Sequence, residues 1–204
     1  MDRERVTIEG AVFLTTLHLA GPIGLLALHG GVEGGTAELA REVASRTGAT
    51  LLTFTQPTGP PQHIPSIRMS PCAPLTTFLA HSTLTISLHG HNRRSAPRTI
   101  YVGGSNRPAA RVLATALSHW APDFVPLTTL SEIPNPLRGL HPDNPVNQTR
   151  EGGVQLELPV LARTSHPAPT CPEVPPTEVV DALTVGVRLL AAHRGANGPG
   201  PRES

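Results

Sequence analysis

The sequence predicts an α/β fold: one domain built on a mixed, mostly parallel β-sheet with helices on its faces. Short apolar runs of strand character alternate along the chain with segments of helical periodicity, as in sheets with crossover connections. The 204 residues are 38% hydrophobic, which is enough for one domain with its own core. We expect a single domain over residues 1–194, which includes a proline-rich connector at 165–176, and a disordered tail at 195–204.

The expected strands are apolar runs that stop at a glycine, a histidine or a proline. The first run, AVFLTTLHLAGPIGLLAL at 11–28, resembles the apolar region of a signal peptide, but two threonines, His18 and the Gly21-Pro22 pair interrupt it. We therefore interpret it as two strands joined at Gly21-Pro22. The further strand segments are 51–54, 83–90, 99–104 and 152–159.

Three segments have helical spacing. In TAELAREVASRTG at 36–48 the apolar residues fall on one face, Thr36 can cap the first turn, and Gly48 can close the last. The other two helices are expected at 110–120 and 177–194. Residues 55–72 and 131–151 are rich in proline, glycine and asparagine, so we expect them to be long loops at the edge of a site.

Composition excludes several classes of function. A net charge of +1 with 15% charged residues gives no reason to expect a nucleic-acid or membrane partner, and 3% aromatics do not make a stacking surface for bases. Cys72 and Cys171 lie far apart and outside any CxxC pattern, so we expect two free thiols in a reducing compartment. No other segment approaches the ~18 apolar residues of a membrane span, which predicts a cytoplasmic protein.

Polar residues stand where two of the expected strands end. His29 follows the strand at 23–28, Glu33 lies in the glycine-rich turn after it, and His89 ends the strand at 83–90. In open α/β sheets, ligands bind beyond the carboxyl ends of the strands. Two imidazoles and one carboxylate suit a zinc ion whose fourth position is open to water. His91 is a rival to His89 as the third ligand.

The strand at 152–159 offers a base for hydrolysis. Alternation along a strand places Gln155 and Glu157 on one face and the apolar residues on the other. Glu157 lies two residues before Pro159, near the end of the strand. It could take a proton from a water molecule and pass it to a leaving nitrogen.

The residues alone leave other interpretations open. HGGVE can be a tight turn with a surface glutamate, and GGVEGGT before a helix, or YVGGSN with Arg107, can be a phosphate cradle. The phosphate interpretation lacks the Walker lysine, because the chain contains no lysine. A serine hydrolase is not indicated, since no GxSxG motif is present.

As an ordered set, the motifs are more specific than any one of them. HGGVEGGTAELA, SLHGH, YVGG, NPVN and GGVQLELP with an arginine shortly after it follow one another between about residues 25 and 163. The chain thereby resembles the phage and bacterial poly-γ-glutamate hydrolase family, a branch of the carboxypeptidase-A-like zinc peptidases. The resemblance implies a carboxypeptidase-A-like fold, a Zn²⁺ cofactor and metallopeptidase cleavage of γ-glutamyl amide bonds in a peptide or polymer.

The resemblance also implies roles for particular residues. His29, Glu33 and His89 match the metal ligands, and Glu157 matches the general base that assists attack by water held at the metal. Arg163 matches an arginine that would bind substrate carboxylates.

Two features depart from the family pattern. HGGVE has one residue fewer between its histidine and its glutamate than many members carry. Gln148 stands where the resemblance implies an arginine, so Arg150, together with Asn147, would complete the carboxylate site. The alternatives are another zinc amidohydrolase, acting on cell-wall or small acyl-glutamate amides, and a non-enzymatic phosphate- or nucleotide-binding α/β module.

Overall fold

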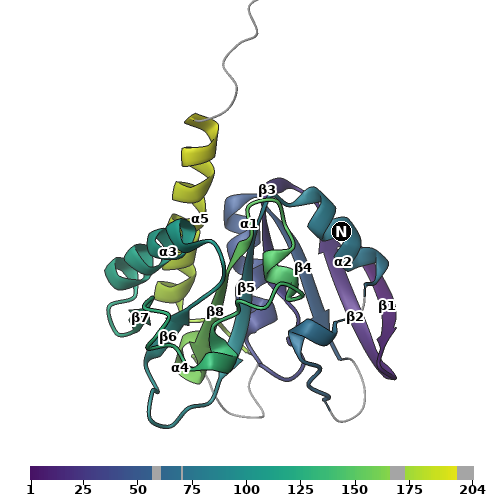
Figure 1. The fold of residues 1–204 in the computed structure, drawn as a ribbon, viewed down its shortest axis with the longest axis horizontal. Helices are drawn as coiled ribbons and strands as arrows, with labels where there is room; N and C mark the ends of the chain where they lie inside the picture. Colours follow the sequence, from purple (N-terminus) through teal and green to yellow (C-terminus); the bar gives the residue numbers. More distant parts are fainter. Residues whose placement is uncertain (57–60, 70, 166–172, 197–204) are drawn as a thin grey trace, which may run out of the picture.

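The computed structural model describes residues 1–56, 61–69, 71–165 and 173–196 and contains one eight-stranded mixed sheet (Figure 1). The predicted α/β class is confirmed. The strand order is β1-β2-β4-β3-β5-β8-β6-β7. The strands are β1 (Asp2–Ile8), β2 (Ala11–His18), β3 (Gly21–Ala27), β4 (Ala49–Thr55), β5 (Leu84–His91), β6 (Thr99–Val102), β7 (Val125–Leu127) and β8 (Gly153–Pro159).

The centre of the sheet is parallel, and each flank joins it through an antiparallel pair of strands. β4, β3, β5 and β8 run in the same direction, whereas β2 pairs antiparallel with both β1 and β4, and β6 pairs antiparallel with β8. From β3 the chain goes to β4 on one side, and later to β5 on the other side. The point where the strand order reverses is where such sheets bind ligands, beyond the carboxyl ends of their strands.

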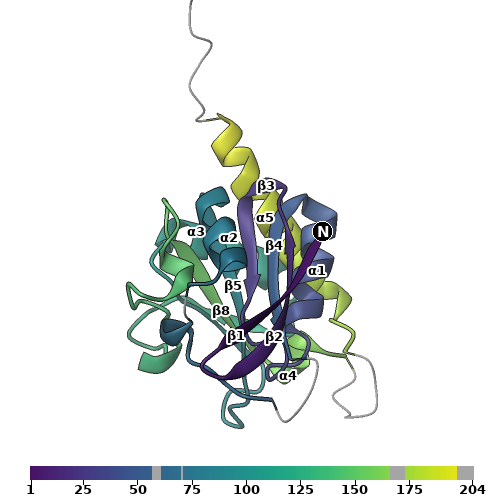
Figure 2. The same cartoon turned by 90° about the vertical axis from the view of Figure 1, so that its right-hand side faces the viewer.

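Helices cover the two faces unequally. The apolar residues of α1 (Thr36–Thr47), α3 (Arg107–Trp120) and α5 (Thr177–Ala196) form one core with alternate residues of the central strands. α2 (Ala73–His81) packs with β1, β2 and β4 in a second core on the opposite face, and Figure 2 shows α1 and α2 on opposite sides of β3 and β4. The short helices are η1 (Ser66–Arg68), η2 (Asn135–Leu137), η3 (Pro145–Asn147) and α4 (Val160–Arg163).

Strand alternation determines which side chains lie under the loops. Leu88 and Leu156 contribute to the core with α1, α3 and α5, so their neighbours in β5 and β8 point to the opposite face. Those neighbours include His89 and Glu157, and both are buried. At this end of the sheet, loop residues and the short helices η1 and η2 lie over the polar face.

Three expectations need correction. β1, β7, α2 and α4 were not expected; in β1 only Val6 and Ile8 are buried, so its sequence carries little hydrophobic pattern. The helix at 110–120 begins earlier, at Arg107, because the Asn106 side chain accepts a hydrogen bond from the Ala109 N–H. α5 extends to Ala196, two residues into the expected tail.

Parts of the predicted connector and tail, residues 166–172 and 197–204, lie outside the described residues, as does Cys171. Cys72 is a half-buried free thiol. None of the described helices combines the length and the apolar character that crossing a membrane requires.

Candidate metal centre

The glycine-rich turn after β3 brings His29 and Glu33 together. The Glu33 N–H donates to the His29 carbonyl at 2.7 Å, which closes a five-residue turn and places both side chains on the same side. His29 Nδ1 lies 3.1 Å from Glu33 Oε1. Gly30 allows this turn to pack tightly, because a Cβ there would lie 2.7 Å from the Ala37 Cβ and 2.9 Å from the Phe54 carbonyl oxygen.

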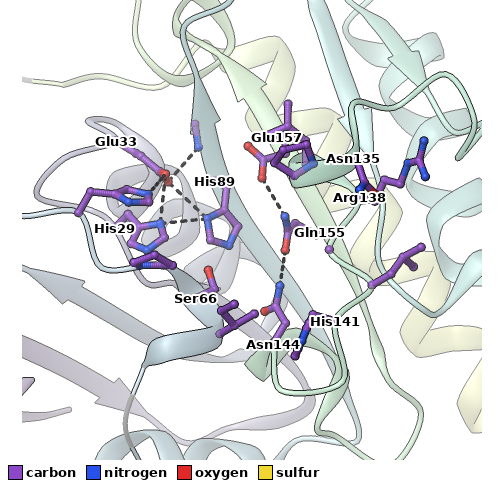
Figure 3. A pocket seen from close by; sticks show the side chains of 18 residues that line it. His29, Glu33, Ser66, His89, Asn135, Arg138, His141, Asn144, Gln155 and Glu157 are labelled. Atoms are coloured by element: carbon purple, nitrogen blue, oxygen red, sulfur yellow. Dashed lines mark hydrogen bonds and ion pairs between the residues drawn. The ribbon is translucent and has the colours of Figure 1, made fainter. Parts of the chain in front are cut away.

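His89 of β5 joins this pair from the neighbouring strand (Figure 3). Its Nδ1 lies 3.1 Å from His29 Nδ1 and 3.5 Å from Glu33 Oε2. The Gly90 N–H donates to Glu33 Oε2 at 2.9 Å, which fixes the carboxylate against β5. One possible ligand atom from each of the three residues lies within 4.8 Å of the others. The structure thus brings together the three residues expected at the metal.

The outer nitrogens of both imidazoles are occupied. His29 Nε2 lies 2.7 Å from the Ile64 carbonyl oxygen, and His89 Nε2 lies 2.9 Å from Ser87 Oγ. A carbonyl oxygen can only accept, so Nε2 of His29 carries the proton and a neutral ring turns the lone pair of Nδ1 toward the cluster. This is how proteins usually orient a histidine that binds a metal.

The charge states of the cluster also suit a cation. Burial alone would raise the pKa of Glu33, but its contacts with the imidazoles of His29, His63 and His89 outweigh burial and hold that pKa well below its usual range. Burial lowers the pKa of His89, although the Glu33 carboxylate opposes the shift. A carboxylate and a neutral imidazole are the forms that bind a metal ion.

Glu157 lies beside the cluster on β8. It is the register partner of His89 on the parallel strand, and both side chains line a cavity of about 720 Å³ (Figure 3). The side chain is buried, and burial, followed by the negative charge of Glu33, raises the pKa of Glu157 well above its usual value. A carboxylate with a raised pKa is a stronger base near neutral pH.

Loops complete the cavity and contribute residues to which the sequence analysis gave no role. His63 stacks on His29 with ring centres 4.5 Å apart, and its Nε2 lies 3.7 Å from Glu33 Oε1. Asn144 and Gln155 line the wall next to Glu157. The position of Gln155 on the same strand face as Glu157 follows from alternation, whereas nothing in the sequence near His63 indicates its position.

Arg163 does not line this cavity. It is 7% exposed, and its Nη1 donates to the Gly34 carbonyl at 2.5 Å. Its guanidinium lies against Gly90, where a Cβ would come within 2.6 Å of the Arg163 Cζ. Arg163 therefore fills the space between the glycine-rich turn and β5, and this position differs from the expected one at a substrate carboxylate.

The tight contact between Gly90 and Arg163 predicts a measurable cost for a methyl group. Gly90→Ala should destabilise the protein by about 1–3 kcal/mol, because neither the buried guanidinium nor the strand can move freely. For a chain of this size we expect the Tm to fall by roughly 2–4 °C per kcal/mol. In an Arg163→Ala background the same change should cost much less, and equal costs in both backgrounds would contradict the contact.

The other two residues expected to bind substrate are also elsewhere. Arg150 has a side chain that is 79% exposed near the start of β8, at the opposite end of the strand from Glu157, and pairs with Glu151. Asn147 donates to the carbonyls of Gly139 and His141, and so it braces the loop over the cavity without lining the cavity itself.

Two alternatives from the sequence are not supported by the positions of their residues. His91 Nε2 lies 2.8 Å from the Thr99 carbonyl oxygen, and the ring lies against Tyr101 rather than in the cluster. Arg107, the cation expected at a phosphate cradle, donates to three backbone carbonyls, including that of Thr128.

The family model described as poly-gamma-glutamate hydrolase matches residues 13–166. The chain belongs to this family. The predicted family is therefore confirmed for the segment that contains the cluster and Glu157.

Two curated relatives of this member of the poly-γ-glutamate hydrolase family come from Bacillus subtilis (strain 168). The UPF0714 protein YndL is 31% identical over 155 residues, which is 74% of this chain and 59% of YndL. The SPbeta prophage-derived UPF0714 protein YoqZ is 34% identical over 137 residues, which is 66% of this chain and 47% of YoqZ. The chain thus aligns with roughly half of the length of these relatives.

Solved structures share the fold. A bacteriophage poly-gamma-glutamate hydrolase superimposes with a TM-score of 0.76 at 22% identity, over 92% of both chains. A zinc-free apo structure of YndL superimposes with a TM-score of 0.72 at 26% identity, over 89% of this chain and 90% of that one.

Proposed function

We propose that this chain is a zinc-dependent hydrolase that cleaves γ-glutamyl amide bonds. The observation that carries the proposal is the convergence of His29, Glu33 and His89 within 4.8 Å, next to Glu157, in a cavity of about 720 Å³. Membership of the poly-γ-glutamate hydrolase family supports the reaction and the substrate.

The donor set fits Zn²⁺. Two imidazole nitrogens and a carboxylate oxygen are ligands that catalytic zinc sites use, and three protein ligands leave a position open. The two Nδ1 atoms at 3.1 Å and the Glu33 carboxylate turn their lone pairs toward one another, an arrangement that a cation between them would stabilise. A bound zinc ion would supply a Lewis acid that polarises the amide carbonyl and acidifies a bound water.

Glu157 would move the protons of the reaction. As a buried carboxylate with a raised pKa, it would take one proton from the attacking water. It would then deliver that proton to the amide nitrogen as the C–N bond breaks, which yields a carboxylic acid and an amine. The cavity walls limit bulk water around the carboxylate, which strengthens its electrostatic interactions.

Family membership, rather than an arginine in the cavity, supports the γ-glutamyl substrate. Arg138 is the only arginine among the described residues that line the cavity, and its Nε donates to the Ile133 carbonyl at 2.9 Å. In Figure 3 its side chain points away from the cluster. The half-exposed imidazoles of His63 and His141 are the other cation-forming groups along the wall beyond the cluster.

Metal analysis combined with product analysis tests the proposal. The purified chain should contain about one zinc per molecule, and it should shorten poly-γ-glutamate but not poly-α-glutamate. Chelation should stop the reaction and added zinc should restore it. Small γ-glutamyl amides form a second arm, which separates a polymer hydrolase from an amidase. Cleavage that persists in chelator, or that ignores the γ linkage, would contradict the proposal.

A further inference from the structure

A chain of three buried polar side chains connects the loop over the cavity to Glu157 (Figure 3). Asn144 Nδ2 donates to Gln155 Oε1 at 2.8 Å. Gln155 Nε2 in turn donates to Glu157 Oε1 at 2.8 Å. All three side chains belong to residues that are 4–5% exposed, so water cannot readily replace any of these hydrogen bonds.

The direction of this chain is set by the backbone. The Val146 N–H points at the Asn144 side chain at 3.2 Å, and only an oxygen can accept from it. The Asn144 amide nitrogen must therefore face Gln155, and the Gln155 atom that receives its proton must be the oxygen. It follows that the NH₂ group of Gln155 faces Glu157, whichever way either amide might turn in isolation.

We infer that Gln155 is a positioning residue for Glu157, and that Asn144 sets the direction in which the Gln155 amide points. The N–H of Gln155 occupies Glu157 Oε1, so Oε2 is the oxygen that takes up and releases the proton. This inference rests on the proposed role of Glu157 as the base, and it assigns a task to two residues that do not themselves react.

The packing around Gln155 opposes rotation of its amide. Gly139 lies directly over this side chain, where a Cβ would come within 2.6 Å of Gln155 Oε1 and 2.7 Å of its Cβ. Asn147 holds the Gly139 carbonyl by a hydrogen bond of 2.8 Å, which keeps the loop closed on Gln155. The hydrogen bond from Gln155 also counteracts the effect of burial, which raises the pKa of Glu157.

Two substitutions of Gln155 test the inference in the zinc-loaded enzyme. Gln155→Met removes the donor and keeps the length of the side chain; kcat should fall roughly 10-fold or more while KM changes little. The acid limb of the pH–rate profile should move to higher pH, because the ionised form of Glu157 loses a hydrogen bond.

Gln155→Glu keeps the acceptor for Asn144 but presents an oxygen to Glu157, so the two carboxyl groups must share a proton. The acid limb of the pH–rate profile of Gln155→Glu should move up by about one pH unit or more, and the activity of this variant should recover as the pH increases. A defect of folding would not be reversed by pH in this way.

Gln148→Met is the matched control, since Gln148 is exposed and, among the described contacts, its side chain donates only to the Asp143 carbonyl. It should leave the acid limb in place. If the acid limb of both Gln155 variants lay at the same pH as in the unsubstituted protein, the inference would be overturned.

A readout without catalysis separates this inference from the proposed function. The carboxyl ¹³C signal of Glu157 should titrate at higher pH in Gln155→Met than in the unsubstituted protein, with or without hydrolysis. If the unsubstituted protein cleaves none of the substrates, the proposed function fails and the titration still decides the role of Gln155. Equal titration in the two proteins would overturn the inference.

Discussion

Glu157→Gln is expected to keep zinc and to lose hydrolysis. The substitution preserves the size of the side chain and an oxygen that can accept from Gln155, but an amide cannot take the proton of the attacking water. Loss of a general base costs roughly 10²–10⁴ in rate. The measurement is kcat on the γ-glutamyl substrate, with the zinc content of the same preparation determined alongside.

A stability measurement on the metal-free protein complements this prediction. The folded-state pKa of Glu157 is raised by burial, so the carboxylate destabilises the fold at pH values above its unfolded-state pKa, and this cost is absent below it. Glu157→Gln should therefore raise the Tm at pH 8 and make little difference near pH 4. If the variant lost zinc together with activity, Glu157 would be a ligand and the assignment as base would be wrong.

His89→Ala is expected to abolish both zinc binding and activity. It removes one of the three proposed ligands and leaves only His29 and Glu33 to hold the ion. We expect zinc affinity to fall by roughly 100-fold or more, since replacing even a residue that only hydrogen-bonds to a metal ligand typically lowers metal affinity 10–100-fold. Competition with a chromophoric chelator would measure the change.

His91→Ala is the matched control for this experiment. His91 lies two residues further along β5, on the same face, and is buried to a similar extent. Its imidazole contacts the Thr99 carbonyl and not the cluster, so this variant should retain zinc. Retention of zinc by His89→Ala, or its loss from His91→Ala, would show that the ligand set differs from the one proposed.

The parts of the site that local rules determine could be predicted from the sequence. His29 and His89 end adjacent parallel strands, so the topology alone places them at one edge of the sheet. The orientation of Glu157 follows from strand alternation. The even-numbered residues of β8 face the core, so the odd-numbered residues, which include Glu157, point to the opposite face. The turn from His29 to Glu33 contains five residues, and this is enough for both side chains to meet.

The arginines could not be placed in this way. Arg163 lies only six residues after Glu157, yet α4 turns the chain so that its side chain ends beneath Gly90, outside the cavity. Arg150 precedes β8, and the length of that strand separates it from Glu157. Distance along the sequence does not specify the direction of a side chain after a turn, and the cavity wall is made by loops without a hydrophobic period.

The glycine-rich turn also contacts a residue that lies beyond the segment matched by the family model. Glu173 accepts a hydrogen bond from the Gly35 N–H at 2.5 Å, and the helix that follows packs on α1 and α3. The family match ends at residue 166. The portion of the sequence that carries every proposed ligand is thus held partly by residues beyond it, and we expect the smallest working unit to include α5.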